Sequence, residues 1–128
     1  MYQQLANFYN TKGEFDKTME ALNQRAEREP TNPEAYFTIS TYYWDNAQRN
    51  AKLRDPEKRE NVEKGLAAVD KALSLKSDYM EALVYKGLLL RIQATLERDA
   101  NKQQELIKQA EALRDQAEEI RKKRATGA

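Results

Sequence analysis

Apolar residues recur along the chain at intervals of three and four, the spacing that places side chains on one face of a helix. A motif of an aromatic, an aliphatic, a small and a second aromatic residue occurs twice, 34 residues apart, and a looser third copy follows 47 residues after the second. The copies are Tyr2, Leu5, Ala6 and Tyr9; Tyr36, Ile39, Ser40 and Tyr43; and Leu83, Lys86, Gly87 and Leu90. We expect the aromatic and aliphatic side chains to form the core, and the small residue to lie where two helices approach closely.

Each copy is followed by a second apolar stretch with helical spacing. These stretches are Phe15, Met19, Leu22 and Ala26; Val62, Leu66, Val69 and Leu73; and Leu106, Ala110, Leu113, Ala117 and Ile120. The sequence therefore predicts an all-α chain of three helical hairpins, and no strand pattern competes with it. The six expected helices lie near residues 2–11, 14–28, 33–53, 56–75, 79–98 and 101–124.

Local signals mark the ends of several of these helices. The expected N-terminal caps are Asn32 before Pro33, Asp55 before Pro56, and Asp78 with Glu81 three residues later. A short polar side chain at the cap accepts a backbone N–H, and proline suits the first helical position because its missing N–H has no partner there. Gly13 fits the first turn, which favours positive φ. The charged, glycine-free segment 47–64 adds about 13 residues to the second hairpin, and we expect it to lengthen both helices.

The spacing resembles the tetratricopeptide repeat family, whose 34-residue pattern is W-x2-L-G-x2-Y, then A-x3-F, then P. The first copy carries the resemblance best, with Tyr2, Leu5, Ala6, Tyr9, Gly13, Phe15, Thr18, Leu22 and Pro30 at the family's positions. The third copy departs from the pattern, because Lys86 takes the aliphatic place and no proline closes it. The resemblance covers about residues 1–98. It implies one domain over 1–128, a right-handed helical-hairpin solenoid of about three repeats whose second and third hairpins are lengthened.

In that reading the repeats span 1–32, 33–78 with the insertion, and 79–124 with a long capping helix, followed by a tail at 125–128. The first helices of such repeats line a concave groove that binds peptides or protein segments. The groove candidates implied by the resemblance are Asn7, Asn10, Phe37, Thr41, Trp44, Tyr85, Leu88 and Arg91. Asn hydrogen-bonds a peptide backbone through donor and acceptor, and Trp, Tyr and Arg often dominate interface energies.

For Trp44 and Phe37 an alternative stays open, namely packing within the chain against the helices expected at 33–53 and 56–75. One subgroup of the family binds the acidic C-terminal tails of chaperones through a clamp of Lys, Asn and Arg. Only Asn7 survives at the corresponding positions here, and Glu81 would repel a carboxylate. The resemblance therefore does not extend to chaperone-tail binding.

The last expected helix carries an apolar seam from Leu106 to Ile120 with charged flanks. Short residues interrupt this seam, which favours packing within the chain as a cap over a homodimeric coiled coil, although a homodimer remains the alternative. The basic run at 121–124 fits a helix C-terminus better than a nucleic-acid site, since no aromatic residues are interleaved with it.

The amino-acid composition excludes several kinds of catalytic and metal-binding site. The 128 residues contain no His and no Cys, which removes thiol nucleophiles, disulfides, Cys or His zinc sites and imidazole catalysis. None of the serines lies in a nucleophile elbow. We therefore expect no enzyme, no cofactor and no metal. The net charge of +1 gives no handle on nucleic acid, and no apolar run is long enough to cross a membrane. A soluble protein, cytoplasmic by default, is expected.

Two functions remain. The first is a scaffold that binds a partner peptide or protein segment in the groove. The alternative is structural, in which the chain is an assembly segment of a longer solenoid or a homodimer through the last helix. It is motivated by a chain that begins directly within a repeat helix.

Overall fold

The computed structural model describes residues 1–127, and within them the chain is all-α, with six helices and no strand. The helices are α1 (Tyr2–Thr11), α2 (Phe15–Arg28), α3 (Pro33–Arg49), α4 (Asp55–Leu75), α5 (Met80–Leu96) and α6 (Ala100–Ala125). All six helices predicted from the sequence are present. Ala125, expected at the start of the tail 125–128, is the last residue of α6, and Ala128 lies outside the described residues.

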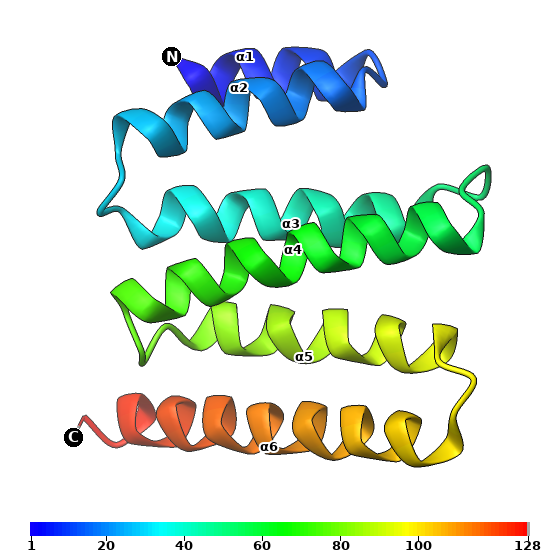
Figure 1. The fold of residues 1–128 in the computed structure, drawn as a ribbon. Coiled ribbons are helices and arrows are strands. Elements are labelled where there is room, and N and C mark those ends of the chain that lie inside the picture. The colour runs from blue at the N-terminus through cyan, green and yellow to red at the C-terminus, as the bar shows by residue number, and fades with distance from the viewer. Residues whose placement is uncertain (128) are drawn as a thin grey trace.

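Consecutive helices run antiparallel, and the first and last helices lie at opposite ends of the molecule (Figure 1). The main contacts are within the hairpins α1–α2, α3–α4 and α5–α6, and α4 also packs on α5. α3 contacts both α2 and α5. Within residues 1–127, however, no Cα atom of α2 comes within 8 Å of one in α4. Both helices therefore flank α3 without closing on each other.

Two of the predicted end signals are confirmed. The Asn32 side-chain oxygen accepts the backbone N–H of Glu34 at 3.0 Å, with Pro33 in the first turn of α3. Gly13 has φ of +74° in the turn between α1 and α2, a region that costs other L-residues about 1–2 kcal/mol. Both signals act within a few residues, which is why the sequence reveals them.

The predicted cap at Asp55 is wrong by one residue, because α4 begins at Asp55 and Arg54 takes the cap position. The carboxylate of Glu57 accepts the backbone N–H of Arg54 at 3.2 Å, which is one half of a capping box. Pro56 is tolerated one position further in, since none of the first four N–H groups of a helix has an intrahelical partner. Asp55 instead places its charge in the first turn, where the helix dipole favours it.

The predicted capping box of Asp78 and Glu81 is not formed. α5 begins at Met80, Tyr79 takes the cap position, and no side chain caps this end. A turn in which the N–H of Tyr79 donates to the carbonyl of Lys76 at 3.2 Å precedes the helix. This turn shifts the helix start past Asp78, whose carboxylate then lies one residue outside the cap.

The second hairpin is lengthened as predicted, with 17 residues in α3 and 21 in α4 against 10 and 14 in the first hairpin. α3 nevertheless ends at Arg49 rather than near residue 53, and 50–54 form a connection. The side chain of Asn50 accepts the N–H of Lys52 at 3.1 Å, a local hydrogen bond that competes with helix continuation.

The small residues of the repeated motif are buried, as predicted. Ala6 and Ser40 have no exposed surface, Gly87 is buried, and the hydroxyl of Ser40 donates to the carbonyl of Phe37 at 2.6 Å. Leu5, expected in the core, is instead 39% exposed. The reason is its place on α1, whose backbone lies close only to that of α2 among the described helices.

α5 is tied to the helices on both sides. Lys86, which departs from the repeat pattern, forms an ion pair of 2.8 Å with Asp70 of α4. On the other side, a Cβ atom at Gly87 would lie 3.5 Å from the carbonyl oxygen of Ala110 in α6. Ala110 and Ala117 are the buried residues of the α6 seam. The predicted packing of this seam within the chain is therefore confirmed.

Candidate functional site

Five of the eight predicted groove residues lie close together on α3 and α5. Tyr85 lies between two aromatic residues of α3, with ring centroids 5.3 Å from Phe37 and 5.5 Å from Trp44, both edge-to-face. The Tyr79 ring adds a fourth member, 5.0 Å from Phe37. Edge-to-face pairs stabilise by about 0.5–1.5 kcal/mol beyond area burial. This aromatic cluster therefore fixes α3 against α5 at the start of the candidate groove.

Trp44 takes part in packing within the chain and also lines a cavity. Trp44 and Phe37 are half-buried and pack against a core cluster shared by α3, α4 and α5, so packing within the chain uses part of each ring. The aromatic ring that Trp44 meets edge-to-face belongs to Tyr85 of α5, so the packing of Trp44 is not limited to the lengthened α4. The remaining face of Trp44 lines a cavity.

The cavity beside Trp44 has a volume of about 360 Å³. Three predicted residues, Trp44, Leu88 and Arg91, converge on it from two helices. The other lining residues are Ala47, Gln48, Lys58, Ile92, Thr95 and Leu96. Sequence reasoning missed all six. Lys58 enters from the first turns of α4, and no local pattern in the inserted segment signals that α4 reaches α5 there.

The α1 end of the predicted groove uses its polar groups within the protein. The side-chain oxygen of Asn7 accepts from the hydroxyl of Tyr42 at 3.2 Å and from the amide of Gln3 at 3.2 Å. Arg25 donates to Gln3 at 3.1 Å and forms ion pairs with two glutamates, Glu29 and Glu34. This network, with Tyr42 and Arg25 as members that the repeat pattern does not indicate, links α1, α2 and α3.

Two of the predicted groove residues, Thr41 and Asn10, do not line the cavity beside Trp44. The hydroxyl of Thr41 donates to the carbonyl of Thr38 at 2.7 Å, so it is used within α3. Asn10 lies at the turn end of α1, where it lines a hollow of about 270 Å³ with Tyr42 and Asp45. The structure therefore brings Phe37, Trp44, Tyr85, Leu88 and Arg91 together and leaves Asn10 apart.

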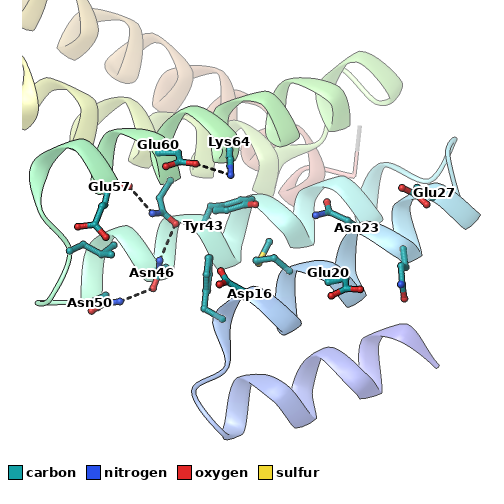
Figure 2. Close-up of a pocket in the computed structure, with 15 residues that line it drawn as sticks. Asp16, Glu20, Asn23, Glu27, Tyr43, Asn46, Asn50, Glu57, Glu60 and Lys64 are labelled. Atoms are coloured by element: carbon teal, nitrogen blue, oxygen red, sulfur yellow. Dashed lines mark hydrogen bonds and ion pairs between the residues drawn. The ribbon is translucent and has the colours of Figure 1, made fainter.

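A larger hollow, which the sequence did not predict, lies between α2 and α4 with α3 as its floor (Figure 2). We call it the acidic cleft; its volume is about 740 Å³. Its lining residues are Phe15, Asp16, Met19, Glu20, Asn23, Gln24, Glu27, Tyr43, Asn46, Asn50, Leu53, Glu57, Glu60, Asn61 and Lys64. Five carboxylates thus face one ammonium. The carboxylates come from α2 and α4, which are remote in sequence, so only the packing of both helices around α3 gathers them.

Burial and pairing set the electrostatics of the acidic cleft. Burial raises the pKa of the Tyr43 hydroxyl, which keeps it neutral and a hydrogen-bond donor. The hydrogen bond from Lys64 to Glu60, at 3.0 Å, raises the pKa of Lys64 and holds its charge. The ring of Tyr43 also meets Phe15 edge-to-face, with centroids 5.7 Å apart. The floor is therefore apolar and neutral, while the rim is negative.

The chain matches no protein-family model, no curated protein and no solved structure. Over residues 1–127, no group of three or more acidic side chains is arranged to hold a metal ion. None of the six helices is both long and apolar enough to cross a membrane.

Proposed function

We propose that this chain is a non-catalytic binding module of tetratricopeptide type, a solenoid of three hairpins that holds a segment of a partner protein along α3 and α5. One observation carries the proposal: Trp44, Leu88 and Arg91, chosen from the repeat pattern, line a single cavity. The order of three antiparallel hairpins and the buried small residue in each support the repeat assignment (Figure 1).

The chemistry of this cavity suits one large side chain of a partner. Its volume of about 360 Å³ lies at the lower end of ligand pockets, which run from roughly 300 to 1,000 Å³. Trp44 offers a ring face held in place by Tyr85, so little conformational freedom is lost on binding. Arg91, which is exposed, adds a planar cation at the rim suited to a carbonyl or carboxylate.

The test begins with peptides selected for binding to the folded chain from a displayed random library. Affinity is then measured by fluorescence anisotropy of the labelled peptides. Replacing Arg91 by alanine should weaken binding about fivefold or more, because truncating an important interface residue costs at least about 1 kcal/mol. Arg98→Ala is the matched control, because Arg98 is also exposed but lies outside the cavity.

Trp44→Ala and Tyr85→Ala should weaken the same peptides more strongly. Trp44→Phe keeps an aromatic packing partner and guards against loss of folding, which circular dichroism checks. Unchanged affinity in folded Arg91→Ala, Trp44→Phe and Tyr85→Ala proteins would show that the cavity is not the binding site.

An assembly role has support of its own. Met1, at the N-cap of α1, and Leu5 and Phe8, within the helix, lie along one side and are 89%, 39% and 52% exposed. Clustered exposed apolar residues mark interaction surfaces. In this alternative α1 packs against another chain or against further repeats, whereas the seam of α6 is turned towards α5. Sedimentation equilibrium tests it: self-association that Leu5→Glu with Phe8→Glu abolishes supports assembly through α1, and a monomer at high concentration argues against self-assembly.

A further inference from the structure

We propose that the acidic cleft between α2 and α4 binds a peptide segment that presents an apolar side chain flanked by Lys or Arg. The cleft is distinct from the cavity beside Trp44. Successive residues of a helix point about 100° apart, so Tyr43 faces the cleft while Trp44 faces α5. α3 thus offers two surfaces, and the acidic cleft is the larger one.

The apolar residues at the floor of the cleft indicate that the ligand presents an apolar side chain. Phe15, Met19 and Tyr43 line the cleft side by side, from α2 and α3. Met19 is flexible and polarizable, which lets it adjust to side chains of different shape. An aliphatic or aromatic side chain placed here would contact both rings of the Phe15–Tyr43 pair.

The carboxylates at the rim of the cleft indicate that the ligand carries Lys or Arg beside its apolar side chain. Asp16, Glu20 and Glu27 line the cleft from α2, and Glu57 and Glu60 line it from α4. Glu60 is paired with Lys64, but the other four carboxylates form no ion pair within residues 1–127. A Lys or Arg side chain entering the cleft is therefore attracted from both walls, and an acidic segment is repelled.

A chain of side-chain amides holds the polar end of the cleft in place (Figure 2). Asn50 donates to Asn46 at 3.3 Å, Asn46 donates to Asn61 at 3.0 Å, and Asn61 donates to the carbonyl of Glu57 at 2.8 Å. These bonds fix the orientation of each amide and tie α3 to α4. A site that is already ordered loses less entropy when a ligand binds.

The chain carries a basic run of its own at 121–124, near the end of α6. α6 and α2 lie at opposite ends of the molecule, so this run reaches the cleft only from a second copy (Figure 1). The occupant is a separate basic peptide, and occupation of the cleft by a second copy is one outcome of the experiment below.

The probe is a short fluorescein-labelled peptide of Lys and Leu, and its counterpart has Glu in place of every Lys. Anisotropy should show binding of the Lys peptide, weakening with added salt, and none of the Glu peptide. Glu20→Gln with Glu57→Gln should weaken binding about threefold to tenfold, since two exposed charge pairs are lost. Glutamine keeps the acceptor through which Glu57 caps α4.

The matched control is Glu105→Gln with Glu111→Gln, which removes the same charge from exposed positions of α6. It should change affinity less than about twofold, because the charges lie far from the cleft. The side-chain amide signals of Asn46, Asn50 and Asn61 in nuclear magnetic resonance spectra should shift with the Lys peptide.

The proposal is overturned by no binding of the Lys peptide up to about 1 mM, by equal weakening in the α6 control, or by amide signals that stay unchanged. Self-association that competes with the Lys peptide and is lost in the Glu20 and Glu57 variant would overturn it in favour of a second copy. Because Trp44 and Arg91 are untouched in these variants, failure here leaves the proposed function separately testable.

Discussion

Replacing the buried helical glycines Gly65 and Gly87 by alanine is expected to shift the free energy of unfolding in opposite directions. Alanine in a helix interior is favoured over glycine by about 1 kcal/mol, because glycine loses more backbone entropy on folding. At Gly87 the new Cβ lies 3.5 Å from the carbonyl oxygen of Ala110 and 3.9 Å from the Cβ of Leu113, which are ordinary contacts. Gly87→Ala should therefore stabilise the protein by about 0.5–1 kcal/mol.

At Gly65 the same change meets atoms that have no room to move. The new Cβ would lie 3.0 Å from one methyl carbon of Leu89 and 3.3 Å from the other, and 3.3 Å from the Cβ of Tyr43. Leu89 is fully buried, and the Cβ of Tyr43 is fixed to its backbone. Overpacking of this kind costs about 1–3 kcal/mol, which offsets or exceeds the helix gain. Gly65→Ala should lower stability by about 0–2 kcal/mol.

Urea unfolding followed by far-ultraviolet circular dichroism measures both changes, provided that the unfolding free energy falls with urea concentration at the same slope in each variant. The two variants should differ by about 1–3 kcal/mol. A double-mutant cycle isolates the part due to Leu89: a Leu89→Ala background removes the contacts with the two methyl carbons and leaves the one with Tyr43, so Gly65→Ala should be less destabilising there than in the wild-type background. Equal or greater stability of Gly65→Ala compared with Gly87→Ala would refute the reasoning.

Three further predictions concern the turns. Asn32→Ala should lower the unfolding free energy by about 0.5–2 kcal/mol, while Asn32→Asp retains most of the cap; thermal unfolding measures both. Gly13→Ala should cost about 1–2 kcal/mol in the same assay because φ is +74°, and an unchanged midpoint would contradict this. The hydrogen bond from Asn32, followed by Arg25, lowers the pKa of Glu29 below 4.5, so its contribution to stability is complete above that pH and is lost as pH falls through the folded-state pKa. Carboxyl titration by nuclear magnetic resonance should show this lowered pKa, and Asn32→Ala should raise it.

Part of the candidate site follows from the sequence. Helical periodicity alone places Phe37, Thr41 and Trp44 on one face of α3, and the repeat pattern places Tyr85 and Leu88 on the corresponding face of α5. The sequence does not reveal whether these faces meet, because that depends on how side chains of both helices interlock. It also missed Tyr42 and Lys58, whose neighbours in space are remote in sequence.

The sequence by itself determined the six helices, the cap at Asn32 and the turn at Gly13, because each depends on hydrogen bonds and side-chain spacing within a few residues. The tertiary structure decided that Trp44 is shared between core and cavity, and that α2 and α4 stand apart to form the acidic cleft. The physical reason is that helix separation is set by the summed sizes of side chains packed across several elements. The separation of two helices therefore cannot be predicted from the local sequence of either one.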